Sequence, residues 1–392
     1  MHIMHCITGL TGDGAQRMLL RLVAGLQERG HHSTIVTLGA REGLADAFQD
    51  LGVPVFAMHL RPTPRVVVKV AQLRRVVRDL RPDIVQGWMY HANLLMSLAA
   101  YSLAQPVPVV WNIRRGLDDL ASRKIVTKAC IRLSAVTSRS AKKIIYCTDR
   151  SRQQHEELGF VRTQGVVINN GFVAERFYRS RQRREEWRHR FGLADHDVAI
   201  GNVGRYDVAK GHTFLIEAFR KVLAQHPRCR LVLVGRGVST ENLELQRAIS
   251  ESGVRERVVL FGECARVEEA YSAFDIYCSS SVAEGFPNVV AEAMLSELPC
   301  VVTDTGAARE LVDGIGYVVS PRDSEALAGA LIAAVSAITT SANQNGTALR
   351  ARKRIIDRYS LGQIVGRYEQ VYGSLALNGA SLEYIHPAAA QF

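Results

Sequence analysis

The first 38 residues alternate between short apolar runs and one amphipathic segment, in an order that few folds accommodate. Residues 3–8 and 33–38 are apolar runs of strand length, and between them apolar residues recur at helical spacing over 18–29. A strand, a glycine-rich turn at 9–17, a helix and a second strand form a βαβ unit, which places the two strands side by side and parallel. Because parallel sheets bind ligands at the carboxyl ends of their strands, the turn lies where a substrate would approach.

The same alternation continues along the chain, and it predicts an α/β protein built on parallel sheets. With 392 residues the chain is longer than a single typical core, which favours two domains. The Asn-Gly pair at 170–171 opens a polar, charged stretch that we interpret as the crossing between them. We therefore expect a first domain at 1–170, a linker at 171–195 and a second domain beginning at residue 196.

The stretch 278–294 contains two carboxylates on different elements. An apolar run ending at Cys278 predicts a buried strand, and Gly285 and Pro287 prevent a helix from running through the following loop. A helix is predicted to start at Asn288, which places Glu284 in the loop and Glu292 on the first helical turns. The N–H groups of residues 288–290 would then form an anion site beside both carboxylates. Carboxylates suited to sugar hydroxyls next to amides suited to phosphate indicate a nucleotide-sugar.

Taken alone, a strand, a loop and a helix with two glutamates is also a common surface arrangement, and the pattern leaves both interpretations open. The run from Glu284 to Met294 resembles the E-x7-E signature of retaining glycosyltransferases with the GT-B fold, particularly family 4. The resemblance extends over about residues 1–372. It implies two Rossmann-like domains with parallel sheets facing a central cleft, with the nucleotide-sugar donor bound by the second domain and the acceptor by the first.

Two cations follow the first strand of the second domain. Gly204 and Arg205 end an apolar run, and Lys210 precedes Gly211 and a helical pattern at 213–224. An arginine at a strand end and a lysine before a helix can bracket a diphosphate, although two surface cations in a loop would look the same. The spacing resembles the Gly-Arg-x4-Lys-Gly pattern of the family, and it is not a P-loop because the lysine precedes its glycine.

The resemblance assigns roles to these residues. Arg205 and Lys210 would stabilise the leaving diphosphate without a metal, Glu284 would orient the sugar ring, and no cofactor is expected. Glu292 would hold the ribose hydroxyls. Glu310 matches a family glutamate, although at a helix start it is equally explained as a capping charge. Further donor contacts are expected from glycine turns and from the loop before the helix, namely Gly14, Gly204, Gly235, Gly262, Glu263, Gly285, Phe286, Pro287, Asn288 and Val289.

Two parts of the first domain depart from the family pattern. The turn at 12–17 resembles a Gly-Gly-Ala-Glu-Arg turn, but Asp13 replaces a glycine and Gln16 the glutamate. The family commonly places a histidine in the cleft, and the expected strand end holds Asn112-Ile-Arg114 instead. His91 is the candidate for that catalytic role, and a structural role at a helix start is the alternative.

The formal net charge of +11 is concentrated in the first half. Residues 61–81 alone contain seven lysines or arginines and one aspartate. An anionic membrane surface attracts such stretches. Ordinary solvated basic faces remain an alternative, and nucleic acid is not expected because no recognition motif accompanies the charge.

No apolar run reaches the length of a membrane span, and the first residues lack the pattern of a signal peptide. The seven cysteines are dispersed without metal-ligand spacing, which favours a reducing compartment. We therefore expect a cytoplasmic enzyme on the inner face of the plasma membrane that glycosylates a lipid-linked or glycan acceptor of cell-surface polysaccharide or lipopolysaccharide.

The C-terminal segment and the alternatives complete the prediction. The tyrosines of 359–374 resemble the final helix that returns to the first domain in this fold, so the second domain would end at residue 358 and a tail would occupy 375–392. A GT-B epimerase or phosphorylase is the nearest alternative function. A non-catalytic nucleic-acid-binding or partner-binding protein is the alternative of another class. Nothing in the sequence indicates the oligomeric state.

Overall fold

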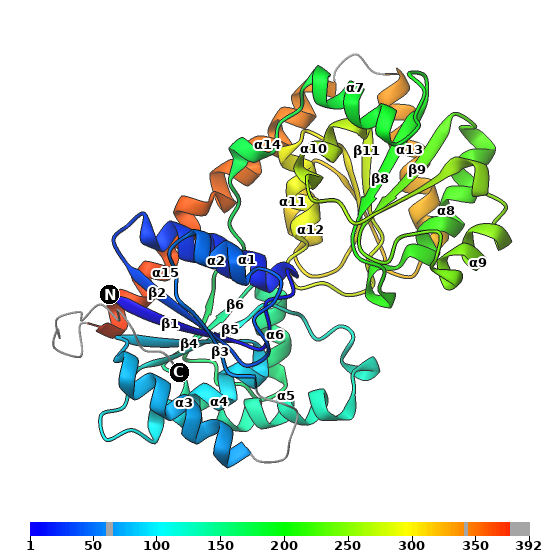
Figure 1. Cartoon of the computed structure of the whole chain (residues 1–392). Coiled ribbons are helices and arrows are strands. Elements are labelled where there is room, and N and C mark those ends of the chain that lie inside the picture. The colour runs from blue at the N-terminus through cyan, green and yellow to red at the C-terminus, as the bar shows by residue number, and fades with distance from the viewer. Residues whose placement is uncertain (60–65, 341–343, 377–392) are drawn as a thin grey trace. The chain divides into compact units, whose positions relative to one another are not determined.

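The structure, a computed structural model, describes residues 1–59, 66–340 and 344–376 (Figure 1). The chain divides into two compact units. Unit 1 contains Met1–Gly171 together with the C-terminal segment from Leu361, and unit 2 contains Phe172–Ser360. Arg61, Arg65 and the part of the expected tail beyond residue 376 lie outside the described residues.

Unit 1 is built on a seven-stranded sheet in the order β3-β2-β1-β4-β5-β6-β7, and every neighbouring pair is parallel. The strand order reverses beside β1, which is the doubly wound arrangement. The strands are β1 (His2–Ile7), β2 (His32–Thr37), β3 (Val55–Ala57), β4 (Ile84–Trp88), β5 (Val109–Ile113), β6 (Lys143–Tyr146) and β7 (Gly165–Val167).

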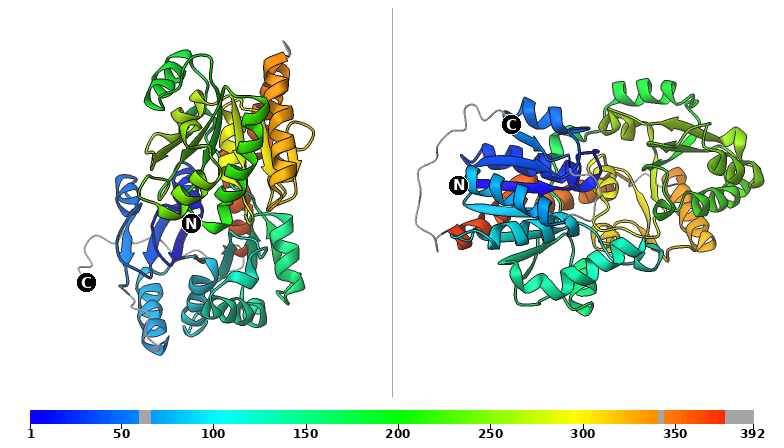
Figure 2. Two further views of the ribbon diagram at one scale, coloured as in Figure 1. Left: turned by 90° about the vertical axis from the view of Figure 1, so that its right-hand side faces the viewer. Right: turned by 60° about the horizontal axis from the view of Figure 1, so that its bottom comes forward.

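Helices cover both faces of this sheet (Figures 1 and 2). One face, with Ile3 and Ile7 of β1, forms a core with helices α1, α2 and α15. The other face, with Met4 and Cys6, packs against α3 and α4, and α4 packs in turn against α5. The helices are α1 (Gly14–Gln27), α2 (Ala45–Asp50), α3 (Val66–Leu80), α4 (Met89–Tyr101), α5 (Ile125–Thr137), α6 (Asp149–Glu157) and α15 (Leu361–Ala376).

The last helix, α15, is attached to unit 1 by buried polar contacts as well as by its apolar side. The amide of Asn112 donates to the Tyr368 hydroxyl at 2.9 Å, and the Tyr372 hydroxyl donates to Gln86 Oε1 at 2.6 Å. Gly25 permits the close approach of α1 and α15, because a Cβ at this position would lie 2.6 Å from a methyl group of Val365. These contacts join the C-terminal segment to the sheet of the first 171 residues.

Unit 2 is built on a six-stranded sheet in the order β10-β9-β8-β11-β12-β13, again parallel throughout. The strand order reverses beside β8, as it does beside β1 in unit 1. The strands are β8 (Val198–Val203), β9 (Cys229–Val234), β10 (Val258–Gly262), β11 (Ile276–Ser279), β12 (Cys300–Thr303) and β13 (Tyr317–Val319).

In unit 2, helices α8, α9 and α13 form one core with the sheet, and α11 packs against β11 and β12. The helices are α7 (Arg181–Arg190), α8 (His212–Gln225), α9 (Leu243–Glu251), α10 (Val267–Ala270), α11 (Asn288–Leu295), α12 (Ala308–Val312), α13 (Ser324–Thr340) and α14 (Gln344–Tyr359). The predicted start of a helix at Asn288 is confirmed.

The segment predicted as a linker, 171–195, is instead part of unit 2 from Phe172 onward. Its helix α7 buries Trp187, whose ring lies 5.8 Å from the ring of Phe261. Arg188 is also buried and donates to Asp275 at 3.3 Å. Seven of the ten residues of α7 are arginine or glutamate, so the helix has no apolar stripe from which it could be predicted. It is attached to the unit through the Trp187 ring and ion pairs such as Arg188–Asp275.

Among the described residues, no helix combines the length and the apolarity that crossing a bilayer requires.

Candidate functional site

Three glycines meet at the carboxyl ends of β8, β9 and β10. Gly235 has a φ of +154°, and a Cβ there would lie 2.0 Å from the carbonyl oxygen of Gly204. The amide of Gly235 donates to the carbonyl of Gly262 at 2.7 Å. All three glycines were predicted donor contacts, and the structure brings them together; glycine is required at Gly235 because a side chain there would collide with the backbone of Gly204.

The loop after Gly204 holds the two predicted cations. Asp207 accepts from the amide of Ala209 at 2.9 Å and begins the 3₁₀ helix Val208–Lys210. Its second carboxylate oxygen accepts from the guanidinium of Arg205, at 2.8 Å from Nη2 and 3.3 Å from Nε. The position of Arg205 is therefore defined by an aspartate two residues away rather than by solvent.

Lys210 and Glu284 form an ion pair. Lys210 Nζ donates to Glu284 Oε1 at 2.6 Å, and the hydroxyl of Ser281 donates to the same oxygen at 2.7 Å. The side chains are 24% and 11% exposed, so the pair is largely shielded from water. A lysine from the β8 loop and a glutamate from the β11 loop thus share one location.

The backbone also joins these two loops. The amide of Val282 donates to the carbonyl of Ala209 at 2.8 Å, and the Ser280 hydroxyl donates to the carbonyl of Lys210 at 3.0 Å. Gly211 has a φ of +64°, and a Cβ there would lie 2.2 Å from the carbonyl oxygen of Ser280. Glycine is required at this position by both its conformation and its surroundings.

A third loop supports Glu284 from the end of β12. Gly306 has a φ of +56°, and a Cβ there would lie 2.1 Å from the carbonyl oxygen of Gly285. The chain beside Glu284 therefore rests directly on the backbone at Gly306. This contact joins the loops after β11 and β12 at the site.

The residues leading into α11 differ in part from the expectation. The amide of Val290 donates to the carbonyl of Pro287 at 3.0 Å, so one of the three N–H groups expected to be free for an anion is occupied. The first helical turn is tightened by this i→i−3 bond, which is a common way to satisfy an end amide. The donor contacts expected from Asn288 and Val289 stay predictions.

Phe286 was a predicted donor contact, and its ring instead packs inside unit 2. It is 6% exposed, and its centroid lies 6.0 Å from the ring of Phe172 and 5.5 Å from that of Tyr359. The aromatic side chain follows the hydrophobic effect into the unit, so only the backbone at this position is available to a ligand.

Glu292 is buried on α11 and is held by a tyrosine. Tyr271 Oη donates to Glu292 Oε2 at 3.2 Å, and Glu292 is 7% exposed. Burial, and then the charge of Glu292, raise the pKa of the Tyr271 hydroxyl well above its usual range. The phenol therefore stays protonated, and its O–H can donate to the Glu292 carboxylate or to the carbonyl of Val289, which lies at 3.3 Å.

His212 begins α8 directly after the loop that holds Lys210. It is 2% exposed, and within the described part of the chain neither ring nitrogen has a hydrogen-bond partner. Burial, followed by repulsion from Lys210, lowers the pKa of His212 to about 4. The imidazole is therefore neutral at physiological pH and adds no charge beside Lys210.

Two further predicted residues of unit 2, Glu263 and Glu310, are exposed. Glu263 is exposed directly after β10. Glu310 lies in the first turn of α12 and accepts from the Tyr359 hydroxyl at 2.8 Å. The Glu310 carboxylate therefore has a structural hydrogen-bond partner on α14, which explains its position without a ligand.

Gly14 and His91 belong to unit 1. Gly14 is the first residue of α1, and the turn before it is closed by Arg17 Nε, which donates to the carbonyl of Gly12 at 2.9 Å. His91 is exposed on the first turn of α4. Partial burial, and then repulsion from Lys69, lower the pKa of His91, so it is a neutral imidazole at physiological pH.

Arg114, at the strand end where the family histidine was expected, is buried. It donates to the carbonyl of Ile168 at 2.8 Å and to the hydroxyl of Tyr368 at 3.3 Å, and it also contacts Asn170. This arginine connects β5, the chain after β7 and α15.

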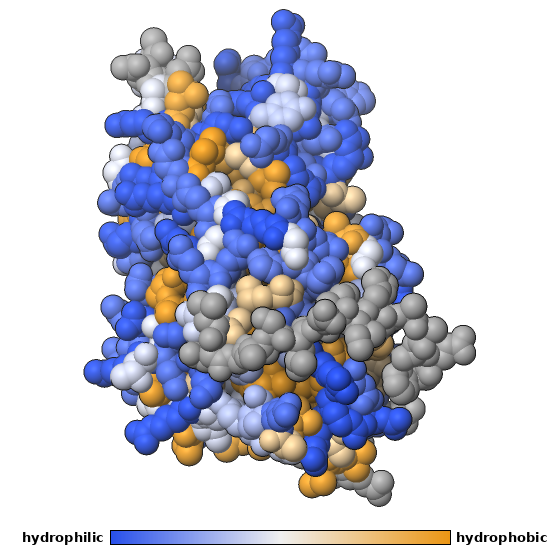
Figure 3. All heavy atoms as spheres, turned by 90° about the vertical axis from the view of Figure 1, so that its left-hand side faces the viewer, coloured by the Kyte–Doolittle hydropathy of each residue, from blue (hydrophilic) through white to orange (hydrophobic). Residues whose placement is uncertain are grey.

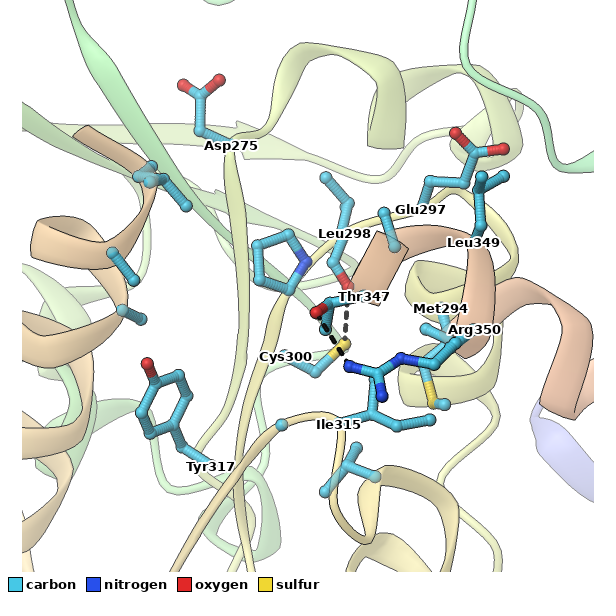
Figure 4. A pocket seen from close by; sticks show the side chains of 18 of the residues that line it. Asp275, Met294, Glu297, Leu298, Cys300, Ile315, Tyr317, Thr347, Leu349 and Arg350 are labelled. Carbon is cyan, nitrogen blue, oxygen red and sulfur yellow. Dashed lines mark hydrogen bonds between the residues drawn. The ribbon is translucent and has the colours of Figure 1, made fainter. Parts of the chain in front are cut away.

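A separate cavity of about 640 Å³ lies in unit 2 (Figure 4). Asp275, Glu297, Cys300 and Tyr317 line it together with residues of α13 and α14. Among the residues described, none of the predicted donor-binding residues lines this cavity. The candidate site is therefore the region around the Lys210–Glu284 pair.

Sequence reasoning missed three residues that position the site, namely Asp207, Ser281 and Tyr271. Asp207 stands before a short helical turn, where an N-cap is typical, and that signal could have identified it. Ser281 lies in a run of three serines, of which the sequence does not single out one. Tyr271 is 21 residues before Glu292, and only the fold brings them together.

The fold and these loops define a two-unit GT-B protein. Along residues 13–171 the chain matches the family described as "Glycosyl transferase 4-like domain", and along 197–337 it matches "Glycosyl transferases group 1". It is 30% identical over 329 residues to EpsF of Bacillus subtilis (strain 168), which is provisionally named a glycosyltransferase, covering 81% of this chain and 82% of EpsF.

Two further similarities also extend over most of the chain. The capsular polysaccharide biosynthesis glycosyltransferase CapM of Staphylococcus aureus is 24% identical over 340 residues, 81% of this chain and 84% of CapM. The crystal structure of Anabaena Alr3699/HepE in complex with UDP-glucose superposes with a TM-score of 0.82 at 21% identity, covering 95% of this chain and 100% of that one. The chain belongs to the group 1 glycosyltransferases, and it is an enzyme of that family with the predicted GT-B fold.

Proposed function

We propose that this enzyme is a retaining glycosyltransferase that moves a sugar from a nucleotide-sugar donor, bound in unit 2, to a glycan or lipid-linked acceptor. The acceptor belongs to the synthesis of cell-surface polysaccharide or lipopolysaccharide, and unit 1 binds it. The single observation that supports the proposal most is the Lys210–Glu284 ion pair at the carboxyl ends of the unit 2 strands.

The pair presents opposite charges to two parts of one ligand. An ammonium group has three N–H donors, and among the described residues Glu284 takes one of them, which leaves two for phosphate oxygens. The second oxygen of Glu284 is available to a sugar hydroxyl, since Ser281 and Lys210 both bind Oε1. Diphosphate and sugar ring would thus be held on either side of the pair.

Arg205 supplies the second positive charge. Its guanidinium is planar and can donate to phosphate oxygens as well as to Asp207. Together with Lys210 it stabilises the negative charge that develops on the diphosphate as the bond to the sugar breaks, and preorganised charge of this kind is usually a large part of catalysis. We infer that no metal is needed for this step.

In the proposal, Glu292 and the glycine turns after β9 and β10 bind the nucleoside. The carboxylate of Glu292 accepts from the ribose hydroxyls in the proposal, with Tyr271 fixing its orientation. In the same proposal, the turns at Gly235 and Gly262 contact the base or the ribose. The HepE complex with UDP-glucose makes UDP-sugars the first donors to test.

The acceptor proposal draws on the relatives and on charge. CapM is named for capsular polysaccharide biosynthesis. The basic first half of the chain is compatible with an acceptor presented at an anionic membrane surface, and we place the enzyme at the cytoplasmic face of that membrane.

Donor binding is tested by thermal unfolding with UDP-, GDP- and ADP-sugars, because a ligand that binds only the folded state raises the unfolding temperature by mass action. One nucleotide class should raise it, and Glu292→Gln should reduce the increase. If no nucleotide-sugar raises the unfolding temperature at millimolar concentration, the proposal is wrong. The anomeric configuration of the product, measured by NMR, tests retention separately.

A further inference from the structure

The exposed side of helix α5 is apolar. Ile125, Val126, Leu133 and Val136 are 83%, 72%, 54% and 80% exposed. Their spacing places them on one side of the helix, since 3.6 residues make a turn. The opposite side, which includes Ile131, is buried in the core of unit 1. Folding of unit 1 therefore does not account for the outer apolar stripe.

The neighbouring helices extend this surface. Leu98 and Tyr101 of α4 are 54% and 40% exposed, and Val67 and Val68 of α3 are 81% and 51% exposed. Helix α4 contacts both α3 and α5, so the three helices lie side by side. We call their exposed residues the α3–α5 face. The right-hand view of Figure 2 turns this side of unit 1 forward. Figure 3 shows one face of the molecule, on which apolar atoms are dispersed among hydrophilic ones along the lower edge.

The charge on these three helices is predominantly positive. Helix α3 has four basic residues and one acidic residue, Asp79, while α5 has two basic residues and no acidic one. Helix α4 has neither lysine, arginine nor acidic residues. Arg74, Arg78 and Arg132 are exposed. Apolar side chains interspersed with cations are the composition of a surface that lies in a bilayer interface.

The geometry points to the α3–α5 face as the surface by which unit 1 docks onto a bilayer of anionic lipid. The apolar stripe of α5 enters the interface, and the flanking arginines and lysines contact lipid phosphates while their aliphatic parts lie along the apolar boundary. This inference rests on the proposed function for its purpose, because a lipid-linked acceptor is reached from that surface.

A second copy of the chain is a poorer occupant. In a two-fold dimer the same patch lies on both sides of the interface. The basic residues of one copy would then face those of the other, and only Asp79 of each copy's three helices would offset the repulsion. An anionic bilayer offers the complementary charge and an apolar layer in the same place.

The test is flotation of the full-length protein with vesicles of phosphatidylcholine alone or mixed with phosphatidylglycerol. Wild type should float with the mixed vesicles and not with phosphatidylcholine alone. Ile125→Ser combined with Val136→Ser should weaken binding at least tenfold, and Arg132→Gln should weaken it at low salt more than at high salt.

The matched control is Leu243→Ser combined with Leu349→Ser. These residues of unit 2 are 81% and 57% exposed, so the change removes comparable apolar surface elsewhere. The control should float like wild type. All variants alter exposed side chains, and an unchanged unfolding temperature checks that they fold.

The inference is overturned if wild type ignores anionic vesicles, or if Ile125→Ser with Val136→Ser floats like the control. It is also overturned if light scattering shows a dimer that this double variant dissociates while vesicles remain unbound. Flotation needs no donor, so it is independent of catalysis. A protein that floats as expected but is not stabilised by any nucleotide-sugar would contradict the proposed function and leave this inference intact.

Discussion

Lys210 and Glu284 are separated by 74 residues in the chain and by 2.6 Å between Nζ and Oε1 in the structure. Each residue follows a different strand of one parallel sheet, Lys210 after β8 and Glu284 after β11, and these two strands are direct neighbours. Because neighbouring parallel strands end at the same edge of the sheet, the loops that follow β8 and β11 lie next to each other. The order of the strands therefore brings Lys210 and Glu284 together.

Removing Lys210 should abolish most of the transfer activity. We expect Lys210→Ala to lower kcat by about 100-fold or more, the order observed when one preorganised charge partner of a transition state is lost. The measurement is initial-rate kinetics with the donor that stabilises the protein. Lys221→Ala is the control, because Lys221 of α8 also forms an ion pair in unit 2, with Glu325 of α13. Equal rates for the two variants would count against the assignment of Lys210.

Gly306→Ala should affect activity more than Gly314→Ala. Both glycines have a left-handed φ, +56° and +65°, and a side chain there costs roughly 1–2 kcal/mol. Only at Gly306 does the new Cβ collide with backbone, at 2.1 Å from the carbonyl of Gly285, while nothing lies within 4 Å at Gly314. We expect both variants to lose stability and Gly306→Ala alone to lose turnover at least tenfold. Turnover that falls equally in both would show that the loop beside Glu284 does not depend on this contact.

Chelation of divalent metal should leave the rate unchanged. Arg205 and Lys210 provide the positive charge that a metal supplies in other transferases. We therefore expect the rate in EDTA to stay within about twofold of that of the untreated enzyme, a change in activation free energy well under the roughly 1.4 kcal/mol of a tenfold change in rate. The measurement is the initial rate after dialysis against EDTA, with and without added Mg²⁺. A rate that collapses in EDTA and returns with Mg²⁺ would replace the two-cation mechanism with a metal-assisted one.

The stability of unit 1 should decrease as the pH falls from about 6.5 to about 4. His155 is buried, its Nδ1 donates to the Ser151 carbonyl at 2.6 Å, and its Nε2 accepts from the Tyr90 hydroxyl at 2.7 Å. Burial lowers the pKa of His155 to about 4 from the usual 6.5. In this window the unfolded chain binds more protons than the folded one, so the free energy of unfolding falls with pH, and it levels off below the folded pKa.

The shift corresponds to a loss on the order of 3 kcal/mol across the window. Urea unfolding at several pH values measures it. His155→Leu should be less stable than wild type at pH 7.5, and the difference should shrink by about that amount at pH 4. Gln153→Leu, at an exposed and non-ionisable position of the same helix α6, is the control and should keep the wild-type pH dependence. An unchanged difference between wild type and His155→Leu at both pH values would contradict the prediction.

Much of the fold followed from local pattern. Strands such as β1 and β8 are short, mainly apolar runs followed by a glycine turn, and their spacing along the chain is sufficient to predict parallel α/β architecture. The GT-B class, predicted from the motif at 284–292, is confirmed, and so is the glycosyltransferase family. The assigned roles of the site residues remain predictions.

Helix α7 and strand β3 show where local pattern is insufficient. Helix α7 is attached through Trp187 and the Arg188–Asp275 pair, contacts that depend on residues about 80 positions away. Strand β3 has three residues, too few for a periodicity to appear. Phe286 illustrates the same limit at the site, because its neighbours in the sequence are loop residues while its neighbours in space are Phe172 and Tyr359.

The sequence by itself determined the class of the protein and the kinds of residue at its site, because strand, turn and helix patterns and the Arg-x4-Lys and Glu-x7-Glu spacings are local properties of the chain. Only the tertiary structure decided that Lys210 pairs with Glu284, that Tyr271 contacts Glu292 and that α5 exposes an apolar stripe. The reason is physical: hydrogen bonds, ion pairs and burial depend on distances between side chains, and those distances exist only once the sheets have formed.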